Sequence, residues 1–543
     1  PMLYRFVLSL CFCLPLLASD PVTLAFFQDK PRSLAKDFYI YEYLQRPETT
    51  PQEAKALFGA VHTMNMRFFH LFAKKMDNPT YKKISKCVDL DVNALLKEDN
   101  ECFNIGITLN KISALAKTQL PLILSKLSAK STLIPIVKLM QSDDVYAEAL
   151  KNPDAFLTLF NGSISAYKDG IFDQTSLDSA YLSALSNNPK FNAFAMSIVQ
   201  NDKLDTLRES LLHFKPSLHV KSKTLFYLGL NALRYAQIDQ AMLFFEQSIE
   251  SASKQEEKDK ALFWQYLASK NANALQRLAQ SRDVNIYSLY AREALELPFP
   301  EIVSPVFEGS HPSFDVSDPF AWPRVMNRVY TMKSEEVQTL AQSFRYADTL
   351  PHYVYLMERV THYAKNYYPI PYPEEISGYS THRQALMLAI ARQESRFIPS
   401  VVSTSYALGM MQFMPFVARD IASKEKIEDF DIKAMFHPHI AYLFGNIHLN
   451  FLEKSLYHPL FVAYAYNGGI GFTKRHLLGT AFKEGAYEPF WSLETMQNEE
   501  SREYGKKVLA NYVVYRELLG ESVSIKNLFE TLLIPSVTDR FRN

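Results

Sequence analysis

The sequence predicts an all-α, mostly helical protein, and three observations support this prediction. Glycine accounts for only 16 of the 543 residues, about 3% against a usual share of roughly 7%. Apolar residues recur at helical spacing from about 20 to 297, as in LFYLGLNALRYAQIDQAMLFFEQSIES. Prolines then gather at two places and interrupt this pattern. We therefore expect a long α-superhelical solenoid, a linker module and a compact C-terminal domain.

The N-terminus has the pattern of a secretory signal peptide. Arg5 precedes an apolar run from Phe6 to Ala18, and the first acidic residue is Asp20. The run is too short to span a bilayer, which takes about 20 apolar residues. We expect residues 1–19 to be removed and the mature protein to reach the periplasm. A buried N-terminal helix is the alternative.

Residues 20–297 predict the solenoid. Gly229 and Ala241 lie twelve residues apart, and Phe245 follows four residues later, which is the spacing of a tetratricopeptide-like helical hairpin. The two small residues would let the helices approach closely, and Phe245 would fill the remaining gap. A single unit of this kind does not establish a repeat. We therefore predict an irregular solenoid, whose helices bury a core by stacking on their neighbours.

Two proline clusters suggest the remaining domain boundaries. Six prolines lie between 298 and 323, a density that is incompatible with a continuous helix. The stretch YYPIPYP at 367–373 forms a second break. We predict a linker with a small helical module over 298–368 and a separate C-terminal domain over 369–543.

Charge and rare residues narrow the classes of partner and cofactor. Lys plus Arg and Asp plus Glu each total 58, so no net field would draw the protein to nucleic acid. Cys87 and Cys102 remain after the apolar run; in an exported protein they could pair, and the sequence leaves this open. His437, His439 and His448 could ligate a metal, but unrelated histidines are the commoner case. We expect no metal and no cofactor.

The C-terminal domain contains a glutamate where an apolar residue is expected. Met387, Ile390, Ala391 and Phe397 lie on one face of a predicted helix, and Glu394 completes the same face. Burial there would disfavour the charged carboxylate and raise its pKa. Such a group can act as a general acid near neutral pH. A structural glutamate, paired with a buried arginine or a backbone amide, is the alternative.

Three sequence blocks surround this glutamate. They read RQESRFIPSVVSTSYALGMMQFMP, then AYAYNGGIG at 463–471, then ESREYGKKVLANYVVYREL at 500–518. In this order they resemble the soluble lytic murein transglycosylases. The resemblance implies a lysozyme-like catalytic domain of the goose type, which acts on peptidoglycan glycan strands.

The resemblance also implies roles for individual residues. Glu394 would be the catalytic acid/base, and Glu500 would be a second cleft glutamate that positions the substrate. Ser403 would approach the substrate N-acetyl group, while Arg502 and Tyr504 would be structural companions of Glu500. The other substrate-binding positions would be Gln412, Met414, Tyr466 and Asn467.

A single catalytic carboxylate implies a particular reaction. Ordinary glycosidases use two carboxylates, but here the substrate's own acetamido group would stabilise the cationic intermediate. Protonated Glu394 would protonate the oxygen linking N-acetylmuramic acid to N-acetylglucosamine, then accept the proton of the C6 hydroxyl to give a 1,6-anhydro product. Tyr466 could stabilise the developing charge or orient Glu394 through a hydrogen bond.

Two other functions are compatible with the sequence. A muramidase-type hydrolase would cleave the same bond with water. An interaction protein would bind partners through the solenoid and keep the C-terminal domain as an inactive glycan-binding unit. In each case we expect a monomer that binds glycan strands.

Overall fold

The computed structural model describes residues 22–542 of the chain. The expected signal peptide, residues 1–19, lies outside the described residues. The described chain forms two compact units, with the boundary between Asp77 and Asn78. Among the described helices, none has the length and apolarity that crossing a bilayer requires.

Within its described residues, 22–77, the first unit contains four short helices. They are η1 (Ala25–Phe27), α1 (Leu34–Gln45), α2 (Pro51–Phe58) and α3 (Met66–Lys75). A capping box begins α2, in which Thr50 and Glu53 each accept a hydrogen bond from the other's backbone N–H. The buried carboxylate of Asp37 in α1 accepts hydrogen bonds from the N–H groups of His62 and Thr63, at 2.7 and 2.8 Å. These contacts hold the loop after α2 against α1.

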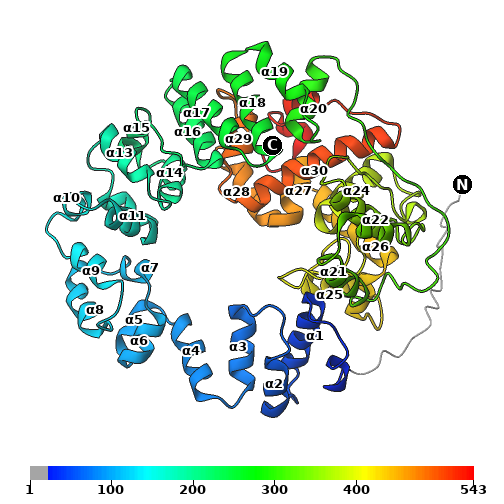
Figure 1. The fold of residues 1–543 in the computed structure, drawn as a ribbon, viewed down its shortest axis with the longest axis horizontal. Coiled ribbons are helices and arrows are strands. Elements are labelled where there is room, and N and C mark those ends of the chain that lie inside the picture. Colours follow the sequence, from blue (N-terminus) through cyan, green and yellow to red (C-terminus); the bar gives the residue numbers. More distant parts are fainter. Residues whose placement is uncertain (1–21, 543) are drawn as a thin grey trace, which may run out of the picture. The chain divides into compact units, whose positions relative to one another are not determined.

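The second unit begins with a long row of helices packed in chain order (Figure 1). Each helix contacts mainly its near neighbours in sequence, which confirms the predicted solenoid. The row consists of α4 (Pro79–Asp89), α5 (Val92–Lys97), α6 (Asn100–Gly106), α7 (Leu109–Ile112), η2 (Lys117–Gln119), α8 (Leu120–Lys126), α9 (Ile134–Met140), α10 (Val145–Leu150), α11 (Pro153–Gly162), α12 (Ser165–Ile171), α13 (Ser179–Ser186), α14 (Phe191–Val199), α15 (Asp205–Ser210), α16 (Ser222–Arg234), α17 (Ile238–Ser251), α18 (Gln255–Ser269), α19 (Ala272–Ala279) and α20 (Ile286–Ala294).

Two sequence features of the solenoid have clear structural counterparts. The pair α16–α17 is the predicted close hairpin: a Cβ added at Gly229 would lie 2.4 Å from a ring carbon of Phe245, and Ala241 is fully buried. Near the start of the row, Cys87 in α4 and Cys102 in α6 form a disulfide. The pairing that the sequence left open is therefore present.

The two proline clusters behave differently from each other. No helix forms between Ala294 and Ala321, as expected, and much of 306–315 is exposed. The module that follows consists of α21 (Ala321–Val329), α22 (Ser334–Gln342) and α23 (Leu350–Val360). Its apolar core includes Trp322 and Phe344 and extends to Ile398 in the C-terminal part.

The second cluster, 367–373, is a buried strap rather than an exposed linker. The Tyr372 hydroxyl donates to Asp348 O at 2.7 Å. Two tyrosines of the C-terminal helices donate to the strap itself, Tyr515 to Pro369 O and Tyr442 to Pro371 O. The prolines of this strap prevent it from forming a helix. Its carbonyl groups instead accept hydrogen bonds from side chains of the core.

The C-terminal part is helical as well, which confirms the all-α class. Its helices are η3 (Pro373–Glu375), α24 (Thr381–Ser395), α25 (Pro415–Lys424), η4 (Ile432–Phe436), α26 (Pro438–Glu453), α27 (Pro459–Gly468), α28 (Ile470–Leu478), α29 (Phe490–Thr495), α30 (Glu499–Leu518), α31 (Ile525–Thr531) and α32 (Pro535–Thr538). The long helix α30 packs against both α24 and α27. Over the described range, β-structure is limited to isolated bridges.

Candidate active site

Glu394 lies in the last turn of α24, at the end of a helix that is buried on almost every side. The expected stripe residues Met387, Ile390, Ala391 and Phe397 are all buried. However, the whole stretch 385–391 is buried as well, so α24 is a central helix and not an amphipathic one. The apolar stripe is therefore not what distinguishes Glu394. Its position in the final turn, where the helix leaves the core, brings the carboxyl toward solvent and leaves the residue half-buried.

The carboxyl of Glu394 receives a hydrogen bond from α30. The Tyr504 hydroxyl donates to Glu394 Oε1 at 2.7 Å. Burial raises the pKa of Glu394 to about 7, the Tyr504 hydrogen bond opposes this rise, and the nearby charge of Glu500 adds to it. The carboxyl is therefore poised to hold and to release a proton near neutral pH.

Tyr466 approaches the same group but does not make the expected hydrogen bond to it. Its hydroxyl donates instead to Met411 O at 2.8 Å. Burial and the charge of Glu394 both raise the pKa of Tyr466 well above its ordinary value. In this structure the Tyr466 hydroxyl therefore does not orient Glu394 through a hydrogen bond, and it instead holds the loop after α24 against α27. Tyr504, which the sequence suggested only as a structural companion, contacts Glu394.

A second polar cluster lies where α27 meets the start of α30. Asn467 Nδ2 donates to Glu500 Oε1 at 3.2 Å, and Ser501 Oγ donates to Asn467 Oδ1 at 2.7 Å. The side chain of Glu500 itself is exposed. The structure thus brings two of the predicted substrate-binding residues, Asn467 and Glu500, into contact.

The other predicted residues lie in the loop between α24 and α25. Ser403 Oγ accepts a hydrogen bond from Ala407 N at 2.9 Å, and Gln412 Nε2 donates to Gly409 O at 2.7 Å. Gly409 has φ +76°, and a Cβ there would lie 2.0 Å from Met435 O, so the loop requires glycine at this position. Met414 is the half-buried N-cap residue of α25. Ser403 and Gln412 therefore also shape the loop.

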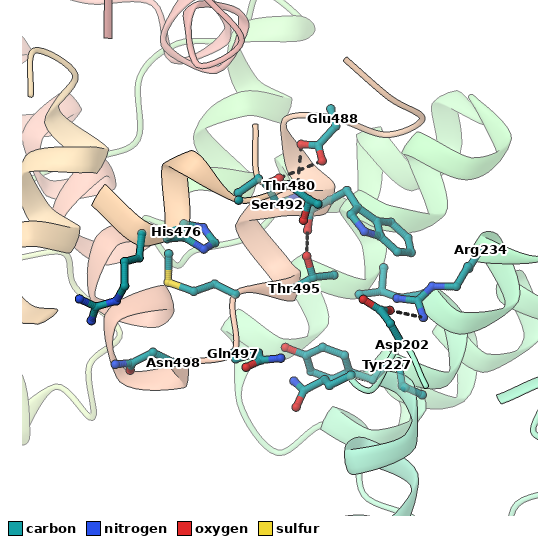
Figure 2. Close-up of a pocket in the computed structure, with 18 of the residues that line it drawn as sticks. Asp202, Tyr227, Arg234, His476, Thr480, Glu488, Ser492, Thr495, Gln497 and Asn498 are labelled. Carbon is teal, nitrogen blue, oxygen red and sulfur yellow. Dashed lines mark hydrogen bonds and ion pairs between the residues drawn. The ribbon is translucent and has the colours of Figure 1, made fainter. Parts of the chain in front are cut away.

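A cavity of about 780 Å³ adjoins the second cluster (Figure 2). Its lining comes from α14–α16 on one side and from 472–498 on the other. These segments are far apart in sequence, so no local pattern could have pointed to this cavity.

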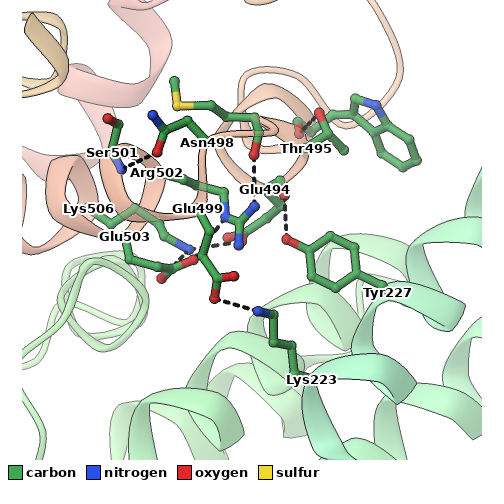
Figure 3. A network of polar contacts seen from close by, with 12 residues as sticks. Lys223, Tyr227, Glu494, Thr495, Asn498, Glu499, Ser501, Arg502, Glu503 and Lys506 are labelled. Carbon is green, nitrogen blue, oxygen red and sulfur yellow. Dashed lines mark hydrogen bonds and ion pairs between the residues drawn. The ribbon is translucent and has the colours of Figure 1, made fainter. Parts of the chain in front are cut away.

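A buried network ties α30 to the solenoid (Figure 3). Lys506 Nζ lies 2.9 Å from Glu494 Oε2 and 3.0 Å from Glu503 Oε2, and it also contacts the Tyr287 hydroxyl of α20. Burial alone would lower the pKa of Lys506, but the two glutamates raise it overall. In addition, the Tyr227 hydroxyl of α16 donates to the backbone carbonyl of Glu494 at 2.8 Å. Lys506 therefore ties α30, which carries Glu500 and Tyr504, directly to α20 and, through Glu494 of α29, indirectly to α16.

Two of the three histidines considered as metal ligands, His448 and His439, have other surroundings. The ring of His448 packs edge-on against Tyr466 and Phe413, and burial lowers its pKa to about 4. His439 lies beside Glu375. Within residues 22–542, no three His, Cys, Asp or Glu side chains converge in a way that could hold a metal ion.

Comparisons with known proteins show which family the C-terminal part resembles. The family model "Transglycosylase SLT domain" matches residues 372–488. The curated soluble lytic murein transglycosylase of Salmonella typhimurium is 28% identical over 163 residues, which are 29% of this chain and 25% of the relative. That of Escherichia coli K12 is 27% identical over 168 residues, 30% of this chain and 26% of the relative. The sequence match thus spans about a quarter of the curated relatives' length.

Two solved structures are similar over most of the chain. The lytic transglycosylase Slt of Pseudomonas aeruginosa has 16% identity and a TM-score of 0.47, covering 91% of this chain and 83% of that chain. The 70 kDa soluble lytic transglycosylase of Escherichia coli has 17% identity and a TM-score of 0.39, covering 92% and 84%. The family assignment rests on the sequence matches. Residues 372–488 match the transglycosylase SLT domain, in agreement with the resemblance to the soluble lytic murein transglycosylases.

Proposed function

We propose that this protein is a lytic transglycosylase that cleaves the β-1,4 bond between N-acetylmuramic acid and N-acetylglucosamine in peptidoglycan. The observation that carries the proposal is the half-buried carboxyl of Glu394, whose pKa is raised to about 7 within an SLT domain. A single group with this pKa can first donate and then accept a proton at neutral pH.

The reaction would proceed in two steps, and Glu394 would act from the same face of the sugar in both. Protonated Glu394 would give its proton to the glycosidic oxygen as the bond to C1 breaks, and the acetamido oxygen of the substrate would stabilise C1. Ionised Glu394, held by the Tyr504 hydroxyl, would then accept the proton of the C6 hydroxyl as that oxygen bonds to C1. The product would carry a 1,6-anhydro ring, and no water would be consumed.

Glu500 would position the substrate rather than transfer a proton. Its carboxylate is exposed and accepts a hydrogen bond from Asn467. Its charge also contributes to the raised pKa of Glu394. With Asn467, Ser403, Gln412, Met414 and Tyr466, it would line the glycan-binding cleft.

Two paired substitutions test these roles. Glu394→Gln keeps the shape of the side chain and removes the titrating proton, so cleavage should fall by about 10²–10⁴-fold or more. Glu500→Gln should cost less, because substrate positioning is shared among several contacts. Binding of glycan strands should survive in Glu394→Gln. If folded Glu394→Gln protein cleaves glycan near the wild-type rate, the assigned role of Glu394 is wrong.

Location and domain boundaries belong to the same proposal. The apolar run that ends at Ala18 supports export to the periplasm, and residues 369–543 would form the catalytic domain. N-terminal sequencing of the protein from the envelope fraction should find a chain that begins near Ser19 or Asp20. A cytoplasmic protein that retains the run would contradict export.

A further inference from the structure

A smaller pocket, with a volume of about 250 Å³, lies at the end of α26. Its walls come from the last turn of α26, the first turns of α28 and the C-terminal tail. The tail is held by pairing with the segment after α26: Arg540 N donates to Ser455 O at 3.0 Å, and Leu456 and Asp539 form an isolated antiparallel bridge. We call this site the tail pocket. The residues that line it belong to the C-terminal part alone and have no role in the proposed function.

The charged side chains that line the tail pocket are all cationic. They are Lys454, Lys474 and Arg540, and each is exposed. Among the described residues no Asp or Glu lines this pocket, and within 22–542 none of the three cations forms an ion pair with a carboxylate. By contrast, Lys506 of α30 is paired with Glu494. Three uncompensated positive charges around one small pocket favour a ligand that bears an anionic group.

The rest of the lining is largely apolar and includes an open aromatic face. Phe451 is 50% exposed, and the half-buried residues Ile470 and Phe541 lie on the other walls. The Lys474 amine lies 5.5 Å from the ring centre of Phe541, so charge and apolar surface adjoin each other. One face of a sugar ring presents C–H groups, which can pack on an aromatic ring. A sugar that carries a carboxylate matches both parts of this lining.

A row of aromatic rings connects the tail pocket with the candidate active site. Tyr466, whose pKa is raised by burial and by the charge of Glu394, packs against His448 with a ring-centre distance of 5.3 Å. His448 in turn stacks on Phe451 at 6.1 Å. Phe451 is therefore two ring contacts away from a residue of the proposed glycan-binding cleft.

The surface between Tyr466 and the tail pocket is open at two glycines. A Cβ added at Gly469 would have no atom within 4 Å, and one added at Gly471 would meet only the Arg475 guanidinium, at 3.6 Å. Gly469 follows Tyr466 by three residues, and Gly471 lines the pocket. A linear glycan chain that occupies the site at Glu394 can therefore continue past these glycines into the pocket.

We propose that the tail pocket is a remote subsite for the glycan strand, and that it takes an N-acetylmuramic acid unit that has lost its peptide stem. The proposal rests on the proposed function and adds a specificity to it. In such a unit the lactyl group ends in a free carboxylate, whereas in a peptide-bearing unit the same carbon forms an uncharged amide. The three cations therefore favour the stripped unit. The reaction that supplies this substrate is the hydrolysis of the amide bond between the lactyl group and the peptide.

Two forms of one strand test this proposal. Glycan strands stripped of their peptides carry the free carboxylate, and amidation with a carbodiimide and ammonia gives strands of the same shape without that charge. The charge variants are Lys474→Gln and Arg540→Gln, and Phe451→Ala tests the aromatic face. Lys424→Gln, at an exposed position of α25 outside the pocket, is the matched control. Steady-state kinetics give kcat and KM for each combination, and co-sedimentation with the strands measures binding without cleavage.

The expected result depends on the charge of the strand. The wild type should have a lower KM on stripped strands than on amidated ones. On stripped strands each charge variant should raise KM about two- to fivefold, with kcat unchanged, because exposed ion pairs have this strength. On amidated strands the charge variants should differ little from the wild type. Phe451→Ala should raise KM about two- to tenfold on both strands, because aromatic packing does not depend on the charge.

Three outcomes would overturn the subsite or the proposed function. Equal KM changes of the charge variants on both strands, or no change on stripped strands, would exclude a carboxylate site. An unchanged KM of Phe451→Ala would exclude a sugar at the aromatic face. If the wild type cleaves neither strand, the proposed function fails, and co-sedimentation decides the subsite by itself: weaker retention of Lys474→Gln on stripped strands alone supports it, and equal retention overturns it.

Discussion

The Tyr504 hydroxyl and Glu394 Oε1 lie 2.7 Å apart although 110 residues separate them in sequence. This hydrogen bond favours the ionised carboxylate, while burial favours the neutral acid. Together with the nearby charge of Glu500, their balance sets the pKa of Glu394 to about 7. The pair is therefore the feature of the site that most directly controls when the proton is held and when it is released.

The first prediction concerns Tyr504→Phe. Loss of the hydroxyl removes a stabiliser of the ionised form, so the pKa of Glu394 should rise. The alkaline limb of the kcat/KM profile, where the general acid is lost, should move up by about one pH unit. Tyr512→Phe is a matched control on the same helix, since its hydroxyl bonds to His382 and Arg516 instead. An unchanged profile in Tyr504→Phe would contradict control of Glu394 by Tyr504.

The second prediction concerns stability. The pKa of Glu394 rises from 4.5 to about 7 on folding, so the folded state holds the proton more tightly and loses relative stability as pH rises through this window. Glu394→Gln should therefore raise the free energy of unfolding by up to about 3 kcal/mol at pH 8 and by little at pH 4. Thermal unfolding at both pH values measures this difference. A variant less stable than the wild type at pH 8 would contradict the desolvation of Glu394.

These relationships show what the sequence could and could not predict about the site. Glu394 and its surrounding blocks could be found because they form a local pattern. The partner of Glu394 could not, because Tyr466 and Tyr504 both reach this region and only the packing of α27 and α30 decides which hydroxyl contacts the carboxyl. The apolar stripe was equally ambiguous, since a helix buried on all sides shows the same spacing as one side of an amphipathic helix.

In the fold, too, local patterns could be predicted from the sequence, whereas contacts between distant segments could not. Helical spacing predicted the solenoid, and the Gly229–Phe245 contact was predicted because a small residue must face a ring at a close crossing. The two proline clusters looked alike in sequence, but one is exposed and the other is strapped to the core by tyrosine hydroxyls. The hydrogen bond between Tyr227 and Glu494 joins residues 267 positions apart. Such contacts depend on how α16 packs against the C-terminal part, and no local sequence pattern predicts them.

The third prediction follows from this difference between the proline clusters. Limited proteolysis should cut first within 306–315, where much of the chain is exposed, and spare 367–373, which is buried. The nicked protein should still elute as one species, because Glu293 of α20 accepts hydrogen bonds from Ser524 Oγ and Ile525 N at the start of α31. Mass spectrometry locates the cuts. First cuts in 367–373 would show that the strap opens.

The fourth prediction concerns the disulfide. Cys87 and Cys102 are separated by 15 residues, and a loop of this size should contribute about 3 kcal/mol. The double change Cys87→Ser with Cys102→Ser should lower the melting temperature of the solenoid, and a reductant should do the same to the wild type. Cleavage at Glu394 should be retained under assay conditions where the chain stays folded. Equal melting temperatures with and without reductant would contradict a stabilising bond.

The most direct test of the central claim is the mass of the products released from purified peptidoglycan. If Glu394 transfers a proton to the leaving oxygen and then takes one from the C6 hydroxyl, the muramic acid ends must lack the water that hydrolysis adds. We predict 1,6-anhydro products from the wild type and at least about 10²-fold less product from Glu394→Gln. Products that carry the mass of an added water would contradict the account and identify the enzyme as a muramidase.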